Sequence, residues 1–110
     1  MMVKHEERLN GNFHELLKRL HDGVLSKRFA EYEDGSDYLH HGVLCAVRVY
    51  RRFNPLSRTY LSLTLMLTGS GEDLFVSAIT TGGSIGIDAL SEPGFLKHLI
   101  QIIEAYKYTE

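Results

Sequence analysis

Apolar residues recur at helical spacing in two segments of the chain. Near the start, the residues at this spacing fall on one stripe of a helix: Phe13, Leu16, Leu17, Leu20 and Val24. Asn12 precedes the stripe and suits a helix N-cap, because its side-chain oxygen can accept a hydrogen bond from an amide of the first turn. Near the end, after a predicted N-cap at Ser91, a broader apolar face comprises Phe95, Leu96, Leu99, Ile100, Ile103 and Tyr106. The pattern therefore predicts two amphipathic helices.

Between the two helices, apolar residues alternate with a period of two. The clearest case is residues 61–68, where leucine at each odd position alternates with Ser, Thr or Met. This period predicts a β-strand with one buried face and one wetter face. We expect further strands at residues 3–9, 28–33, 43–50 and 74–80, and a short additional one at 85–89.

Two of the expected strands are apolar on both faces. In residues 43–50, Cys45 shares a face with valines, and we expect this face to point into the core. The opposite faces of residues 43–50 and 74–80 then form a second apolar surface, which includes Leu44, Ala46, Leu74, Val76 and Ala78. Residues 34–37, Asp-Gly-Ser-Asp, are typical of a turn.

Consecutive strands joined by short turns favour an antiparallel meander. Covering its apolar face with two helices gives a two-layer α+β fold: a curved antiparallel sheet of about five to six strands, in the order β-α-β-β-β-β-(β)-α. The length of 110 residues predicts a single domain over 1–110. This order resembles the helix-grip, or TATA-binding-protein-like, arrangement, a topological analogy that carries no function.

Three segments resemble a family of small uncharacterised proteins from Gram-positive bacteria. These segments are residues 33–37, 42–50 and 74–84. The resemblance extends from the first helix to the last. Because no activity is attached to the family, the resemblance implies no catalytic or binding residue.

Composition and charge exclude several classes of protein. Asp and Glu total 14 against 12 Lys and Arg, giving a net charge of -2, so we do not expect nucleic acid as a partner. The single cysteine excludes an internal disulfide framework and a Cys-rich zinc module. The apolar runs are short for a membrane span, and the first residues lack a signal-peptide core. We therefore expect a cytoplasmic protein without membrane contact.

Two segments are candidates for ligand binding. Arg48, Tyr50 and Arg52 share one strand face, and cations interleaved with rings can hold an anionic ligand. The competing interpretation is a solvated face paired with nearby glutamates. The second candidate is a loop whose backbone amides can face an anion, with Thr81, Gly82, Gly83 and Ser84. Its glycines are better explained by a bulge or a sharp bend in a curved sheet.

The sequence holds no recognisable metal or catalytic motif. His40 and His41 are adjacent, and adjacent side chains of an extended segment point to opposite faces. A nucleophilic Cys45 would need a nearby base, and a thiol among valines is inert. We therefore expect no catalytic residue, no metal site and no cofactor.

These observations favour a non-catalytic binding or regulatory module that self-associates. A two-layer domain has one covered sheet face, so the excess apolar face needs a partner, and a homodimer is the commonest solution. One alternative is a helix-grip domain that binds a small apolar or anionic ligand, in a pocket lined by Phe75, Ile79, Phe95, Leu99 and Ile103. The other is a small hydrolytic or metal-assisted enzyme.

Overall fold

The computed structural model describes residues 2–56, 58–82 and 92–109. Its elements in chain order are β1 (Met2–Asn10), α1 (Phe13–Leu25), β2 (Ala30–His40), β3 (Val43–Asn54), β4 (Thr59–Ser70), β5 (Asp73–Gly82) and α2 (Glu92–Thr109). This order confirms the predicted β-α-β-β-β-β-α arrangement. The short strand expected at 85–89 and the cap at Ser91 lie outside the described residues.

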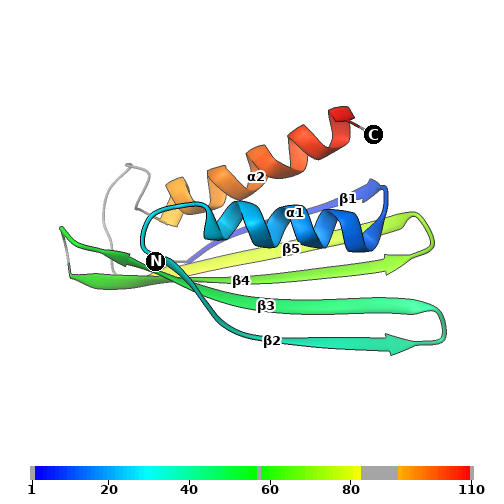
Figure 1. The fold of residues 1–110 in the computed structure, drawn as a ribbon, viewed down its shortest axis with the longest axis horizontal. Coiled ribbons are helices and arrows are strands. Elements are labelled where there is room, and N and C mark those ends of the chain that lie inside the picture. The colour runs from blue at the N-terminus through cyan, green and yellow to red at the C-terminus, as the bar shows by residue number, and fades with distance from the viewer. Residues whose placement is uncertain (1, 57, 83–91, 110) are drawn as a thin grey trace.

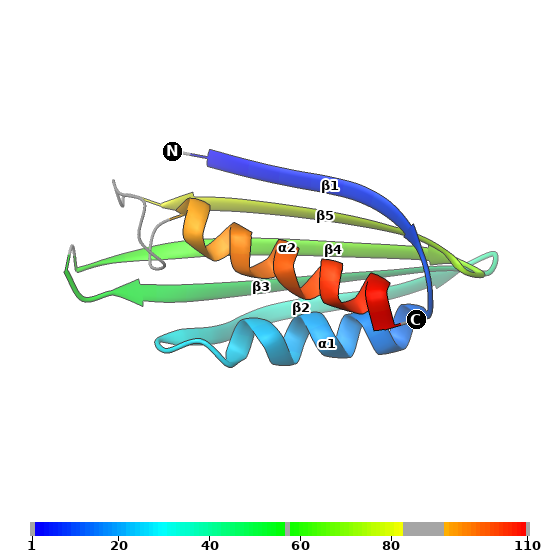
Figure 2. The same ribbon diagram turned by 90° about the horizontal axis from the view of Figure 1, so that it is seen from above.

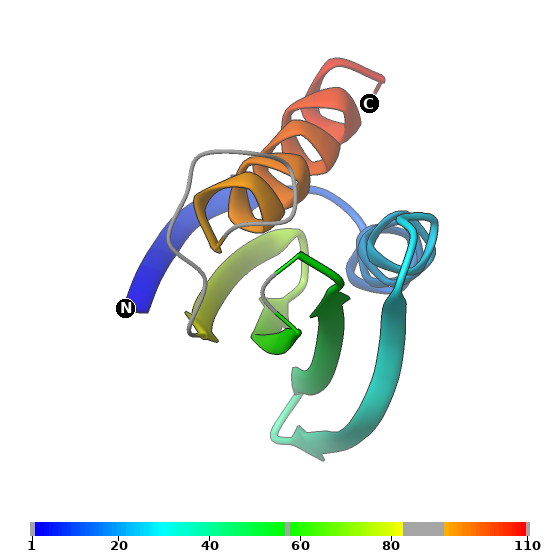
Figure 3. The same cartoon turned by 90° about the vertical axis from the view of Figure 1, so that its left-hand side faces the viewer.

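The strands form one five-stranded antiparallel sheet in the order β1-β5-β4-β3-β2. Both helices lie on the same face of this sheet (Figure 1). Seen from above, α1 runs along the β2 side and α2 crosses the middle of the sheet (Figure 2). The end-on view shows the sheet curving around the helices (Figure 3). The two-layer α+β prediction is confirmed, and we call the face under the helices the inner face and the other the outer face.

Local chemistry sets where α1 begins and how β2 turns into β3. The side chain of Asn12 accepts a hydrogen bond from the amide of Glu15 at 2.9 Å, which is the predicted cap. Between β2 and β3, His41 and Gly42 both have positive φ, 49° and 79°. Two consecutive positive φ angles match the twist of a two-residue hairpin, and glycine adopts the second without strain.

The core lies between the inner face and the two helices. The leucines of β4 form its floor, and α2 covers them with side chains that are fully buried: Phe95, Leu99, Ile103 and Tyr106. The hydroxyl of Tyr106 accepts a hydrogen bond from the backbone amide of Asn12 at 2.7 Å. This bond fastens the end of α2 to the start of α1.

The prediction of which β3 face enters the core was wrong. Ala46 and Tyr50 are buried, whereas Val43 is 42% exposed and Cys45 is half-buried on the outer face. Directly paired residues of neighbouring strands share a face. Ala46 pairs with Leu67 of β4, so the leucine face of β4 fixes which side of β3 points inward.

The same rule corrects two further predictions. Leu74, Val76 and Ala78 of β5 belong to the core, so the surface expected to need a partner is instead covered by the helices. The predicted pocket lining splits accordingly. Phe75 and Ile79 pair with outer-face residues, while the α2 residues expected beside them are buried in the core.

The prediction of a turn at residues 34–37 was also wrong, because these residues belong to β2. A bulge lies between Tyr32, which pairs with Tyr50, and Asp34, which pairs with Val49. The extra residue, Glu33, lets the strand continue through a segment rich in turn-forming residues. Gly35 then pairs with Arg48 on the inner face.

Neither helix in the described part of the chain combines the length and the apolar content that crossing a membrane requires.

Candidate functional site

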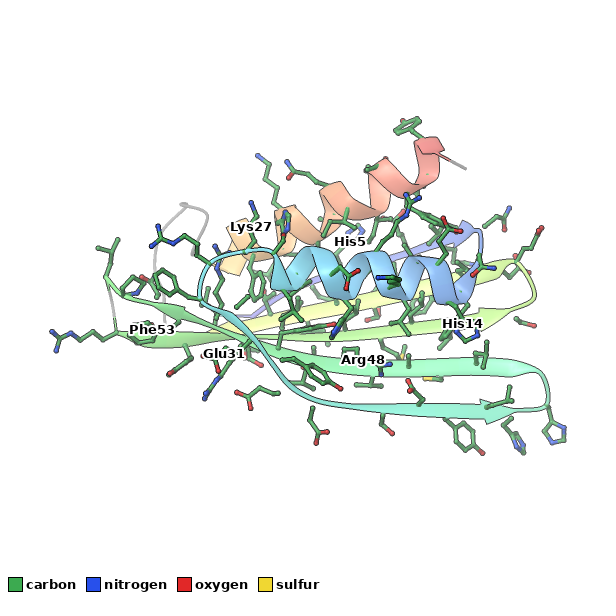
Figure 4. The ribbon with its side chains drawn as sticks, viewed as in Figure 1. His5, His14, Lys27, Glu31, Arg48 and Phe53 are labelled. Atoms are coloured by element: carbon green, nitrogen blue, oxygen red, sulfur yellow. The ribbon has the colours of Figure 1, made fainter. Side chains whose placement is uncertain are left out.

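The candidate site is a groove between α1 and the inner faces of β2 and β3, here named the α1 groove. It consists of two adjoining hollows of about 360 Å³ and 330 Å³, which share His14, Leu17 and Arg48. Figure 4 shows His14 and Arg48 on this side of the molecule, with Phe53 at the opposite end of the sheet. Each volume is at the lower end of the range of small-molecule sites.

The larger hollow, named the apolar hollow, lies toward the turn between β2 and β3. Its apolar lining includes Phe13 and Leu17 of α1 and Leu39 and Leu44 of the inner face; Tyr38 and Cys45, which the register places on the outer face, also border it. Leu39 is 65% exposed, and Leu17 and Leu44 are half-buried. The α1 groove thus keeps apolar surface in contact with water inside a concavity, which is the usual setting for a small-ligand site.

The smaller hollow, named the basic hollow, lies farther along α1. Its lining consists of His14, Leu17, Lys18, His21, Tyr32 and Arg48. The histidines and the lysine come from α1, where positions 14, 18 and 21 follow the helical period. Arg48 and Tyr32 come from the adjacent strands, so the basic groups converge from both layers.

Arg48 occupies the boundary between the two hollows. Its side chain is only 16% exposed. Nη1 donates hydrogen bonds to the Asp37 carboxylate at 2.8 Å and to the carbonyl of Val47 at 2.9 Å. The hydrogen bond to Asp37 raises the pKa of Arg48. Among the described residues, Nε and Nη2 of Arg48 have no hydrogen-bond acceptor, so two donors of a largely buried guanidinium stay available.

The far end of the basic hollow is held in place by an aromatic cluster. Nδ1 of His21 lies 2.8 Å from the hydroxyl of Tyr50, which is fully buried. The ring of Tyr32 contacts both, with centroids 5.2 Å from His21 and 5.8 Å from Tyr50. Burial raises the pKa of the Tyr50 hydroxyl far above its ordinary value, so this group stays protonated. The cluster fixes the orientation of the His21 ring.

Gly35 provides the space in which two lining side chains lie. A Cβ at this position would come within 2.4 Å of the Tyr32 hydroxyl, 2.9 Å of the Val47 carbonyl and 3.0 Å of Arg48 Cδ. Contacts this short are not tolerated without movement of the strand or of the side chains. Glycine at position 35 therefore allows Tyr32 and Arg48 to lie flat against β2.

The sequence-predicted residues divide among three places. Arg48 lines the α1 groove, and Tyr50 lies beneath it. Arg52 is buried under α2, where Nε donates to the carbonyl of Arg28 at 3.2 Å and the guanidinium lies over the ring of Phe95. Leu61 of β4 pairs with Arg52 on one side and with Gly82 on the other, so Gly82 lies two strands away from Arg52 in the same row of the sheet.

The glycine-rich candidate loop is only partly described. Thr81 pairs with Ser62 at the end of β5, remote from Arg48 along the strand. A Cβ at Gly82 would come within 2.4 Å of Leu61, so this glycine permits close packing of β4 and β5. Gly83 and Ser84 lie outside the described residues.

The comparisons with known proteins address the whole chain. A model of a family of unknown function, DUF6054, matches residues 2–107. The chain belongs to the DUF6054 family. The predicted resemblance to a family without a known activity is thus confirmed, and its distribution among Gram-positive bacteria stays a prediction. Among curated proteins, none matches this DUF6054 chain.

Solved structures similar to this DUF6054 chain show the fold alone, because the sequence identities are low. A protein of unknown function from Pseudomonas aeruginosa has a TM-score of 0.57 and 12% identity, over 96% of this chain and 69% of that one. A hypothetical protein from Helicobacter pylori has a TM-score of 0.55 and 10% identity, over 97% and 88%. A START superfamily protein from Mycobacterium smegmatis reaches 0.43 at 8% identity, over 98% and 97%, which is too low to bear on this chain.

Sequence reasoning missed His14, Lys18, His21 and Tyr32 as members of the groove. The signal was present for the α1 residues, since positions 14, 18 and 21 lie at i, i+4 and i+7 beside the apolar stripe. What the sequence lacked was the partner surface, because Arg48 was not known to face α1. Tyr32 was missed because its side is set by pairing with Tyr50 of β3, and the orientation of β3 was predicted wrongly.

The adjacent histidines do not form part of a metal site in the described residues. His40 and His41 lie at the exposed turn between β2 and β3, and their closest ring partners are each other and Tyr38. No group of three side chains suited to a metal ion comes together in residues 2–56, 58–82 and 92–109. The chemistry that the α1 groove offers is recognition by apolar contact, ring contact and charge.

Proposed function

We propose that this DUF6054 chain is a non-catalytic binding module whose ligand site is the α1 groove. The observation that carries the proposal is the pair of adjoining hollows that share His14, Leu17 and Arg48. Together they form a concave site lined by side chains from a helix and from two strands.

Exposed apolar surface in the α1 groove supports this proposal. Under α2 the apolar side chains are fully buried, whereas Leu39 on β2 is 65% exposed. Covering apolar surface of this kind with a ligand is favourable, at roughly 25 cal/mol per Å². A small ligand that lies along β2 and β3 would complete the burial that α1 leaves unfinished.

The proposal is tested by blocking the α1 groove. We expect octanoate to raise the melting temperature of the wild-type protein and to shift backbone amide NMR signals of α1, β2 and β3. Leu17 lines both hollows, so the larger ring of Leu17→Trp should fill the groove and abolish both the rise in melting temperature and the NMR shifts. Leu56→Trp adds the same ring at a site that is 82% exposed and should change neither. Octanoate shifts located elsewhere, or equal losses in the two variants, would contradict the site.

We also propose that the chain self-associates through the outer face of the sheet. The outer face carries apolar side chains from β3, β4 and β5, including Val47, Val49, Met66, Phe75 and Ile79, and in the described chain both helices lie on the opposite side. This surface replaces the one predicted from the sequence. We expect a dimer in sedimentation velocity at tens of micromolar and a monomer for Val47→Lys, with Leu56→Lys as the control. A monomeric wild-type protein would refute it.

A further inference from the structure

The two hollows of the α1 groove differ in the chemistry of their lining residues. Apolar and aromatic side chains dominate the apolar hollow, and the carboxylate of Asp37 lies at its edge with a side chain that is 69% exposed. The basic hollow has imidazole, ammonium and guanidinium groups in its wall, and none of its lining residues is an acid. Arg48 belongs to both hollows, so an occupant of the whole groove meets an apolar surface on one side of this residue and basic groups on the other.

The donor geometry of Arg48 suits a planar anion. Its two available donors, Nε and Nη2, lie on one edge of the guanidinium and point in nearly the same direction, which matches the two oxygens of a carboxylate. The side chain is 16% exposed, so a charge there is screened less than at the protein surface. Asp37 uses only Nη1 and therefore positions the guanidinium without covering this edge.

The other charged groups around the groove leave the basic character in place. Lys18 pairs with Asp22 one helical turn away at 2.7 Å, and both side chains are mostly exposed, so solvent screens this pair. His21 is held by Tyr50 through Nδ1, and its Nε2 has no hydrogen-bond partner among the described residues. His14 adds a second imidazole on the same side of α1.

The sheet supplies a track for an apolar tail. Arg48, Ala46 and Leu44 succeed one another on the inner face of β3, and four residues of a strand span about 13 Å. Leu39 of β2 pairs with Leu44 at the end of this track, opposite Phe13 and Leu17 of α1 in the apolar hollow. A flexible tail that starts at Arg48 thus passes Asp37 and reaches apolar surface at Leu39 and Leu44.

We propose that the ligand of the α1 groove is an amphipathic carboxylate. Its head group accepts hydrogen bonds from Nε and Nη2 of Arg48 beside the basic hollow, and its apolar tail lies in the apolar hollow. This inference rests on the proposed function and adds the chemical class of the ligand. It also makes Arg48 the residue that selects acids over neutral and basic molecules of the same shape.

The experiment compares octanoate, octanol and octylamine, which share a tail and differ in the head group. Isothermal titration of the wild-type protein should give an octanoate Kd at least tenfold below that of octanol, because hydrogen bonds to charged groups are the strong ones. Octylamine should bind more weakly than octanol. Arg48→Gln should raise the octanoate Kd to near that of octanol and so remove the preference for the acid.

Arg51→Gln is the matched control. Arg51 is the same residue type on the same strand, but it lies on the outer face and pairs with Glu31 and Glu33. This variant should keep the wild-type order of the three ligands. Equal affinities for octanoate and octanol would overturn the carboxylate inference and leave the binding module standing. Failure of the wild-type protein to bind any of the three would overturn both, and an equal loss in Arg51→Gln would place the anion elsewhere.

Discussion

The two helices cover the same sheet face with different completeness. Under α2, the side chains of Phe95, Leu99 and Ile103 are fully buried. Beside α1, by contrast, Leu39 is 65% exposed, and Arg48 keeps two free donors among the described residues. The inner face under α2 is thus a closed core, whereas the strip of β2 and β3 beside α1 borders an open groove, although Leu16, Leu20 and Val24 of α1 are themselves buried. The contrast teaches that stability and recognition are assigned to different halves of one small sheet, so substitutions in the two halves should have different effects.

The largest difference is expected between matched leucines of the two halves. Leu99→Ala creates a cavity in a fully buried site and should lower the free energy of unfolding by about 2–5 kcal/mol. Leu39→Ala, in the α1 groove, should cost less than about 1 kcal/mol, because its side chain already contacts water. Urea denaturation followed by circular dichroism measures both. Similar losses at the two positions would mean that the groove is part of the core.

A substitution at Gly35 should disturb the open half without touching α2. Gly35→Ala places a Cβ against the Val47 carbonyl and the Tyr32 hydroxyl, and we expect a loss of about 1–3 kcal/mol from the forced shifts. Ser36→Ala, at the exposed neighbouring position, should stay within about 0.5 kcal/mol of the wild-type protein. A stable Gly35→Ala variant would show that Tyr32 and Arg48 can lie elsewhere at no cost.

Tyr50 connects the two halves, and its hydroxyl gives a signal in alkaline solution. Tyr50→Phe removes the hydrogen bond with His21 and should cost about 1 kcal/mol near neutral pH. Burial raises the pKa of this hydroxyl, whereas an unfolded chain releases the proton at about pH 10. Stability should therefore decline above that pH, because the unfolded state binds fewer protons.

The decline should be shallower in Tyr50→Phe, as measured by urea denaturation across the alkaline range. Tyr108→Phe, whose ring is 85% exposed, is the control and should keep the wild-type slope. Equal slopes in the wild-type protein and in Tyr50→Phe would mean that this hydroxyl ionises freely in the folded state.

The smallest effect is expected where α2 meets β1. Burial alone would raise the pKa of Glu7, but hydrogen bonds from Lys107 and His5 outweigh it, and the net pKa is lowered. This contribution to stability is present above the unfolded pKa of about 4.3 and is lost as the pH falls through the folded value. Glu7→Gln should cost no more than about 1 kcal/mol at pH 7 and should flatten the acid loss.

The control for this charge is Glu72→Gln at the exposed turn between β4 and β5. It should leave the acid limb of the stability curve unchanged. If Glu7→Gln keeps the wild-type acid slope, the pair with Lys107 does not hold the closed half together.

The sequence predicts the helices and strands, but it does not predict which face of each strand is buried. The stripe on α1 and the alternating leucines of β4 are governed by local periodicity, and both were predicted correctly. The orientation of β3 was not, because Cys45 and Ala46 lie on faces of similar apolarity, and only pairing with β4 decides between them. The groove depends on that orientation, so Arg48 was found as a residue but not placed against His21.

Glu33, the extra residue of the β2 bulge, has a consequence for how this site can change. Because Glu33 is left out of the pairing, Asp34 takes the β3 partner next to Tyr50, and Asp37 and Leu39 lie on the inner face. Deleting Glu33 would therefore leave every later pair of β2 and β3 in place, whereas a deletion farther along β2 would shift the register by one residue and turn Leu39 outward. The bulge thus gives descendants of the chain a point at which the length of β2 can change while the wall of the pocket is inherited intact.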